Sequence, residues 1–261
     1  MKRILFFLFL PALCIYLPAQ VKSTTVAADD IEIGIVEKLD QNIPLDVILF
    51  DENGDTVVLS SLFDKPTLIS FVYFRCPGIC SPLMDGIAEV IDKSDLVLGK
   101  DYQVLTISFD PREDRFLAQK KKANYLNLMQ KKDLASAGWH FFTGDSANIK
   151  RLTDATGFRY KPAGNDFVHA ATLIFTDPHG KITRYMNGTY FLPFEVKMSV
   201  IDASKGISGP TINKVLQYCY SYDPEGQSYV LNITKVAGTL ILFLGLILFL
   251  VLILARKKKK N

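Results

Sequence analysis

The chain has 261 residues, of which 49% are hydrophobic and 22% are charged, and this composition excludes an intrinsically disordered or fibrous protein. Its formal net charge is +3, but seven of the cations stand among the first three and the last six residues, which carry no acid. The other 23 basic and 27 acidic side chains give a net charge of −4, so we expect no nucleic-acid partner.

The amino terminus has the pattern of a secretory signal. Lys2 and Arg3 precede an apolar run over residues 4–17, and a more polar region follows. We predict a signal peptide over residues 1–19, cut after Ala19, and an irregular lead-in over residues 20–43. An uncleaved amino-terminal anchor is the alternative.

Residues 44–203 alternate between strand and helix patterns and predict one α/β domain. We expect strands over residues 45–50 and 56–59, joined by an Asn-Gly turn, and over residues 67–74, 102–109, 139–142, 171–176 and 181–186. We expect helices over residues 80–93, 113–131, 146–156 and 193–203. This order fits helices on both faces of a central sheet.

The carboxy terminus has the pattern of a membrane span. Residues 236–255 contain no charge, and 20 helical residues are about 30 Å long, the thickness of the hydrocarbon core. Basic residues follow at once, and the positive-inside rule places them in the cytoplasm. We therefore predict a single-pass protein of the bacterial inner (cytoplasmic) membrane with its domain in the periplasm. Residues 204–235 would form the stalk and residues 256–261 the cytoplasmic tail.

Cys76 and Cys80 are the main candidates for chemistry. They follow a predicted buried strand and open a predicted helix, the usual place for a reactive site in an α/β sheet. In a helical turn their side chains would meet on one face, and amides at the helix start would favour thiolates. Two adjacent thiolates suit Cu(I). A structural disulfide or a pair of buried thiols is the alternative, although Pro77 and Gly78 favour a specialised turn.

A third ligand could come from one of three histidines. His169 stands just before the predicted strand 171–176, and if that strand lies beside the one leading to Cys76, His169 lies at the same end of the sheet. His140 falls inside a short aromatic strand, so we expect it to fill space in the core or on the surface. His179 falls in a turn, so we expect it to lie in solvent. Thiolate with imidazole suits both Cu(I) and Cu(II).

Three segments, in this order, resemble the Sco/SenC copper proteins. They are residues 74–80, residues 108–114, and residues 168–169 followed by 173–175 and 177–180. The resemblance covers about residues 30–203. It implies a thioredoxin-like α/β fold and copper bound by Cys76, Cys80 and His169. Asp110 matches an acidic position near the family's site, where we hypothesise that it supports the ligands, with helix capping as the alternative.

The resemblance also implies a function: a metallochaperone that assists assembly of the binuclear copper centre of cytochrome c oxidase subunit II. The alternative is a thiol–disulfide oxidoreductase that reduces the cysteines of the apo-oxidase subunit through a mixed disulfide at Cys76 and Cys80. Thioredoxin-like reductases place a proline directly before the strand that faces the dithiol. Here residues 168–170 are Val, His and Ala, which favours metal binding.

The sequence departs from the family's pattern at several points. Ser81 follows the second cysteine where the family usually has proline, and Gly78 stands between the cysteines where an acid is usual. Many members carry an amino-terminal anchor, whereas a carboxy-terminal one is predicted here. Cys219 lies in the predicted stalk, and no chemistry is assigned to it.

Overall fold

The computed structural model describes residues 33–209, together with residues 220–223, 228–231, 237–238, 241–245 and 247. The chain divides into two units, Met1–Ile31 and Glu32–Asn261. The first unit, and with it the predicted signal peptide, lies outside the described residues, as do Cys219 and most of the predicted membrane span. Within the described residues, no helix combines the length and the apolar character needed to cross a membrane.

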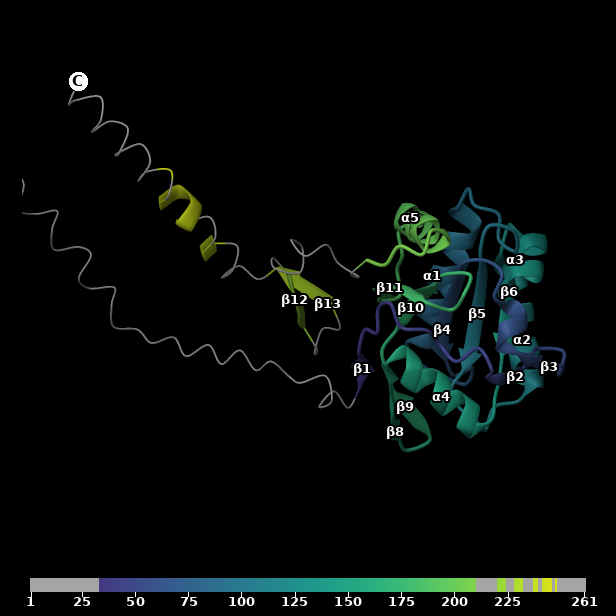
Figure 1. Cartoon of the computed structure of the whole chain (residues 1–261). Helices are drawn as coiled ribbons and strands as arrows, with labels where there is room; N and C mark the ends of the chain where they lie inside the picture. The colour runs from purple at the N-terminus through teal and green to yellow at the C-terminus, as the bar shows by residue number, and fades with distance from the viewer. Residues whose placement is uncertain are drawn as a thin grey trace, which may run out of the picture. The chain divides into compact units, whose positions relative to one another are not determined.

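A five-stranded sheet forms the centre of the domain (Figure 1). Its strand order is β11 (Ile182–Asn187), β10 (Thr172–Thr176), β4 (Thr67–Val72), β5 (Gln103–Ser108) and β6 (Trp139–Phe142). The last three run parallel, β10 is antiparallel to β4, and β11 is antiparallel to β10. All residues of β4, β5 and β10 are buried, as expected of strands covered on both faces.

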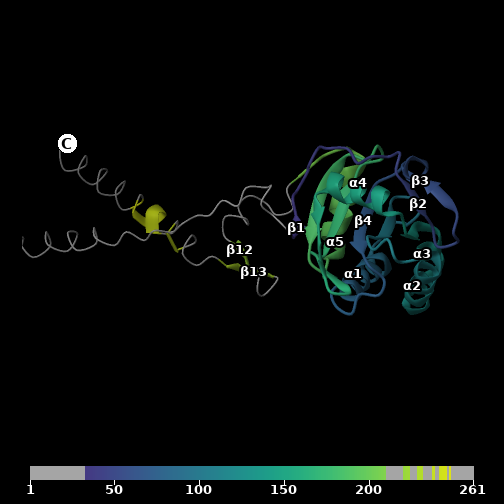
Figure 2. The same cartoon turned by 90° about the horizontal axis from the view of Figure 1, so that it is seen from below.

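Within residues 33–209, five helices pack around this sheet. They are α1 (Cys80–Lys93), α2 (Arg115–Leu128), α3 (Lys132–Gly138), α4 (Ser146–Thr156) and α5 (Pro193–Ser204). Figure 2 shows α1 and α4 on opposite sides of β4, which agrees with the layers predicted from the sequence. The Asp145 side chain accepts a hydrogen bond from the N–H of Asn148 at 2.8 Å, so Asp145 caps α4.

The shorter strands form two-stranded ribbons. These are β1 (Gly34–Ile35) with β7 (Phe158–Arg159), β2 (Ile48–Phe50) with β3 (Thr56–Val58), β8 (Lys161–Ala163) with β9 (Asp166–Val168), and β12 (Tyr220–Asp223) with β13 (Ser228–Leu231). A 3-10 helix, η3 (Leu59–Leu62), follows β3. The β2–β3 hairpin was predicted. The other three ribbons were not, and β12–β13 lies within the predicted stalk.

The helix predicted over residues 113–131 is present but shorter, because α2 spans only Arg115–Leu128, and a second helix that was not predicted, α3, begins at Lys132. Met129 has extended backbone angles, φ −89° and ψ 145°. The carboxylate of Asp92 in α1 accepts hydrogen bonds from the N–H groups of Gln130 at 3.1 Å and Lys131 at 2.9 Å. This contact from another helix replaces the intrahelical bonds that would have continued α2.

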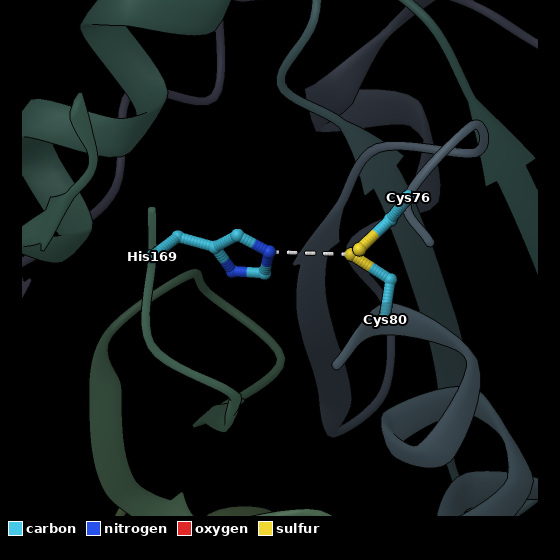
Figure 3. Close-up of side chains that lie close together, drawn as sticks. All are labelled: Cys76, Cys80 and His169. Atoms are coloured by element: carbon cyan, nitrogen blue, oxygen red, sulfur yellow. Dashed lines mark hydrogen bonds between the residues drawn. The ribbon is translucent and has the colours of Figure 1, made fainter. Parts of the chain in front are cut away.

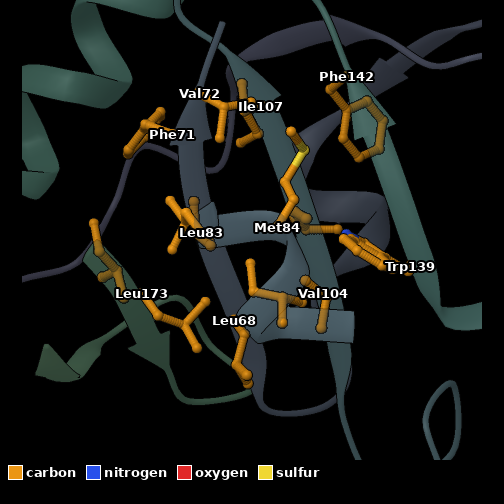
Figure 4. Packing of buried hydrophobic residues seen from close by; sticks show 14 of the residues in the cluster. Leu68, Phe71, Val72, Leu83, Met84, Val104, Ile107, Trp139, Phe142 and Leu173 are labelled. Atoms are coloured by element: carbon orange, nitrogen blue, oxygen red, sulfur yellow. The ribbon is translucent and has the colours of Figure 1, made fainter. Parts of the chain in front are cut away.

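Apolar side chains of α1 pack directly on the sheet (Figure 4). Leu83 and Met84 are fully buried among residues of β4 and β5 such as Leu68 and Val104. Burial of each such side chain contributes about 1.5–3 kcal/mol. This packing fixes α1, and therefore Cys80 at its first turn, relative to the strand that precedes Cys76.

Helix α1 also lies very close to the loop that leads into α5. Gly86 faces this loop, and a Cβ atom added to Gly86 would lie 2.0 Å from the carbonyl oxygen of Thr189. No side chain fits at that distance, so the approach of the helix to the loop depends on glycine. By contrast, a Cβ added to Gly78 would meet nothing within 4 Å.

A buried ion pair joins the β2–β3 hairpin to α2. The Lys122 ammonium contacts the Glu52 carboxylate, and each side chain is 10% exposed. The second Glu52 oxygen accepts the N–H of Phe141 in β6 at 3.1 Å, and Lys122 also donates to the carbonyl of Ser136 in α3 at 3.1 Å. Both charges are therefore paired and hydrogen-bonded, which offsets much of the free energy of burying them.

Candidate metal centre

The two segments that carry the predicted ligands meet at one edge of the sheet. Cys76 follows β4, and Cys80 is the first residue of α1, so both lie beyond the carboxyl end of β4. His169 precedes β10, which pairs antiparallel with β4, so the start of β10 lies beside the end of β4. The pairing on which the prediction of His169 depended is therefore present.

The three predicted ligand atoms lie close together. The sulfur atoms of Cys76 and Cys80 and a ring nitrogen of His169 are all within 4.8 Å of one another. Figure 3 shows the two sulfurs facing the edge of the imidazole ring, and the Cys80 sulfur lies 3.3 Å from Nε2 of His169. Neither cysteine forms a disulfide. A single ion placed between these atoms could contact all three.

The other ring nitrogen of His169 fixes its tautomer. Nδ1 lies 2.9 Å from the carbonyl oxygen of Ala170, and a carbonyl oxygen can only accept a hydrogen bond, so Nδ1 carries the proton of the neutral ring. Nε2 then has a free lone pair that faces the Cys80 sulfur. An imidazole oriented in this way by a backbone carbonyl is typical of metal-binding histidines.

Aromatic side chains hold the imidazole in place. The ring centroids of Tyr73, Phe109 and Phe158 lie 5.8, 5.0 and 5.9 Å from that of His169, and His169 is only 6% exposed. Tyr73 and Phe109 meet the imidazole edge to face, a favourable arrangement of aromatic rings. The packing leaves the ring little freedom and keeps water from most of its surface.

The two thiols have different acidities. A hydrogen bond from the Cys80 thiol lowers the pKa of Cys76 to about 4, against the effect of burial, and the N–H groups of Cys80 and Gly78 and the Tyr73 hydroxyl add to this. Donation of that hydrogen bond, together with burial, raises the pKa of Cys80 far above its usual range. The metal-free pair at neutral pH is therefore one thiolate and one thiol.

The expectation that both cysteines share a helix face is wrong in detail. Helix α1 begins at Cys80, and Cys76 lies in the turn before it. The sulfurs meet because this turn folds back, with the N–H of Cys76 bonded to the carbonyl of Tyr73 at 3.1 Å. The exposed Pro77 and Gly78 form the outer rim of the turn.

Asp110 lies near the site but does not touch the ligands. Its carboxylate forms two short contacts with Arg112, Nε to Oδ1 at 2.7 Å and Nη2 to Oδ2 at 2.8 Å. Burial raises the pKa of Asp110, and the hydrogen bonds and charge of Arg112 outweigh this and lower it. Within residues 33–209, no hydrogen bond joins Asp110 to Cys76, Cys80 or His169. Its supporting role stays a prediction.

The helix-capping alternative for Asp110 is wrong. The cap of α2 is Asp114, which accepts the N–H of Leu117 at 3.0 Å. Arg112, held by Asp110, instead places its guanidinium over the ring of Phe167, 5.2 Å from the centroid. Asp110 thus acts on β9, the strand that leads to His169.

Sequence reasoning missed Glu113, which was interpreted as the first residue of a helix. The helix begins two residues later, and the buried Glu113 carboxylate turns toward the sheet edge. It accepts hydrogen bonds from the N–H groups of Phe74 at 2.6 Å and Arg75 at 2.8 Å and from the Ser108 hydroxyl at 2.6 Å. The signal that could have identified Glu113 in the sequence is an acidic residue shortly after a strand that ends at the site.

The other two histidines lie away from the three ligands. His179 is exposed in the turn between β10 and β11, as expected. His140 is half-buried in β6, with its ring centroid 6.2 Å from that of Phe142. Neither belongs to a group of potential metal ligands within the described part of the chain.

Known proteins are similar to this chain over the range that contains the three candidate ligands. The family model described as SCO1/SenC matches residues 39–200. A SCO1 protein homolog of Bacillus subtilis is 27% identical over 150 residues, which are 56% of this chain and 74% of that protein. The crystal structure of an Aquifex aeolicus VF5 protein is 27% identical, with a TM-score of 0.59, and the match covers 64% of this chain and 95% of that one.

A further solved structure is similar to this chain in fold only. A SCO1/SenC family lipoprotein of Bacillus anthracis is 17% identical, with a TM-score of 0.52, and the match covers 64% of this chain and 95% of that one. These likenesses, together with the strand order of the sheet, confirm the thioredoxin-like α/β fold that the sequence resemblance implied.

Proposed function

The chain belongs to the SCO1/SenC family, and from that premise we propose that it is a copper carrier for the assembly of cytochrome c oxidase. Cys76, Cys80 and His169 hold the copper, and the acceptor is subunit II before its binuclear copper centre is filled. The observation that carries the proposal is the convergence of three ligand atoms within 4.8 Å from segments 89 residues apart.

The chemistry of the donor set supports copper as the cargo. Thiolates favour Cu(I), and an imidazole helps to hold Cu(II), so the site suits both oxidation states. Nε2 of His169 already faces the sulfurs with a free lone pair. Because Cys80 keeps its proton in the metal-free protein, copper binding expels one proton from Cys80, and affinity falls as the pH falls.

The unequal burial of the ligands supports a direction of transfer. Cys80 and His169 are buried, whereas Cys76 is only partly buried and stands beside the exposed Pro77 and Gly78. A ligand from the acceptor therefore reaches the copper on the Cys76 side and replaces Cys76 first. The ion passes between the proteins by exchange of ligands, with no change in oxidation state.

The proposal includes a location. The apolar segment 236–255 anchors the chain in the cytoplasmic membrane, with residues 33–209 in the periplasm. We expect alkaline phosphatase fused after residue 209 to be active in bacterial cells and the same enzyme fused after residue 261 to be inactive. Equal activity of the two fusions would contradict this orientation.

A second function, thiol–disulfide exchange, is favoured by the difference between the two thiols. The Cys76 thiolate would attack a substrate disulfide and form a mixed disulfide, releasing one substrate thiolate. Cys80 would then attack Cys76, leaving an internal disulfide and a fully reduced substrate, and an external dithiol would regenerate the pair. The observation that favours copper over this function is the position of the His169 ring, with Nε2 3.3 Å from the Cys80 sulfur and Nδ1 on the Ala170 carbonyl.

Copper titration of the purified protein separates the two functions. We expect one copper per chain, a thiolate-to-copper absorption band with Cu(II), and loss of both in Cys76→Ser and Cys80→Ser. The matched control is His179→Ala, which removes an exposed imidazole and should change nothing. A protein that takes up no copper at micromolar concentration, yet rapidly reduces a disulfide substrate, would establish the second function instead.

A further inference from the structure

Glu113 holds the segment that leads to Cys76. Its side chain lies at the ends of the neighbouring strands β4 and β5 and is 5% exposed. Oε2 accepts the N–H of Phe74 and the Ser108 hydroxyl, each at 2.6 Å, and Oε1 accepts the N–H of Arg75 at 2.8 Å. One carboxylate therefore satisfies two consecutive amides and ties them to the neighbouring strand.

The chain needs such an acceptor at this point. Strand β4 ends at Val72, and the next residues leave the sheet before the turn that carries Cys76. The N–H groups of Phe74 and Arg75 have no strand partner, and an unpaired buried N–H is unfavourable. Hydrogen bonds to a carboxylate are shorter and roughly twice as strong as neutral ones, so Glu113 holds this segment more firmly than a carbonyl would.

The charge of Glu113 is a further sign of a dedicated contact. Within the described residues, no lysine or arginine forms an ion pair with this buried carboxylate. Three N–H and O–H donors bond to this carboxylate directly, and the Arg112 guanidinium interacts with its charge without forming an ion pair. A buried acid held in this way fixes geometry, because a shift of the Cys76 segment would leave the carboxylate without its donors.

We propose that Glu113 is the positioning residue for Cys76: its carboxylate holds the two preceding amides and so sets the place of the Cys76 sulfur opposite Cys80 and His169. The consequence for copper rests on the proposed function. The hydrogen bonds to the two amides do not depend on the proposed function, because they are present in the metal-free protein. The substitution Glu113→Gln keeps the shape and one acceptor oxygen but removes the charge and turns an amide donor toward an N–H group.

The test compares Glu113→Gln with Asp92→Asn in the full chain. Asp92 is a matched control because its carboxylate also accepts two consecutive amides, those of Gln130 and Lys131, but at the α1–α3 contact. For Glu113→Gln we expect faster hydrogen exchange at Phe74 and Arg75 in the metal-free protein. We also expect about 10–100-fold weaker copper binding, the usual effect of losing a partner behind the ligands, and a shifted thiolate-to-copper absorption band.

For Asp92→Asn we expect faster exchange only near residues 130–131, with the copper affinity and the absorption band unchanged. Should Glu113→Gln fail to fold, Ser108→Ala removes one donor from the carboxylate, and a weakening of about three- to tenfold is expected. Unchanged exchange at Phe74 and Arg75, or a loss of copper affinity no larger than that of Asp92→Asn, overturns the proposal. If the wild-type protein binds no copper, the proposed function fails, and the exchange measurement still decides the role of Glu113.

Discussion

Replacement of His169 by phenylalanine separates its two roles, as a ligand and as part of an aromatic cluster. Phenylalanine is a flat ring, somewhat larger than the imidazole, and can still pack against Tyr73, Phe109 and Phe158. Its extra volume and the loss of the hydrogen bond to the Ala170 carbonyl should together lower the free energy of unfolding by about 1–3 kcal/mol. His169→Ala also removes the packing, and we expect it to lower that free energy by about 3 kcal/mol.

The effect of His169→Phe on copper follows from the donor set. The variant keeps both sulfurs, so we expect its affinity for Cu(I) to fall by about tenfold or less. Cu(II) loses its only imidazole ligand, and we expect more than about 100-fold weaker binding. Loss of a residue that only supports a ligand already lowers metal affinity by about 10–100-fold. Titration against a Cu(I)-specific chelator and a Cu(II)-binding peptide measures the two affinities.

The stability of the variant is the internal control for this experiment. Thermal unfolding of the metal-free proteins shows whether His169→Phe keeps the fold. If the folded variant binds Cu(II) within threefold of the wild type and with the same absorption band, His169 is no ligand, and the site described above is wrong.

Three further predictions concern reactivity and packing. Because the pKa of Cys76 is lowered to about 4, its thiolate is fully formed above about pH 5. Alkylation of the metal-free protein, followed by mass spectrometry, should therefore modify Cys76 at a constant rate from pH 6 to 8 and leave Cys80 unmodified. A tenfold rise in the alkylation rate of Cys76 per pH unit would contradict this. Gly86→Ala should lower the free energy of unfolding by about 1–3 kcal/mol, because its Cβ meets a backbone carbonyl, whereas Gly78→Ala should leave it unchanged; denaturant titration compares the two. Lys122→Met leaves the buried Glu52 carboxylate unpaired and should lower the free energy of unfolding by about 3–5 kcal/mol at pH 7. Adding Glu52→Gln, which removes the unpaired charge, should partly restore the stability.

Local patterns predicted most of the central sheet. Strand β6 was predicted over its observed residues, because its bulky aromatic side chains favour an extended strand over a helix. Strand β4 was predicted because both of its faces are covered, which makes its sequence uniformly apolar. The ribbon β8–β9 was not, because five of its six residues are exposed and no apolar alternation marks it.

The candidate ligands could be named from the sequence, whereas the contacts that support them could not. Cys76 and Cys80 are marked by their spacing, and His169 was named from the inferred place of its strand beside β4 together with the family resemblance. Glu113 and Asp92 act on amides 38 or 39 positions away in the sequence. Such contacts depend on how elements pack, and a single sequence shows neither the pairing nor its geometry.

The separation of the ligands along the chain has a consequence for the order of events during synthesis. The sulfurs belong to the first third of the chain, and the imidazole arrives 89 positions later, after β5 and β6 have been made. A nascent or misfolded molecule offers two thiols without their imidazole, so complete coordination is available only to a finished sheet. Copper bound at the site would then stabilise the folded state by mass action. Where proteases are present, copper-loaded molecules would therefore be degraded more slowly than metal-free ones.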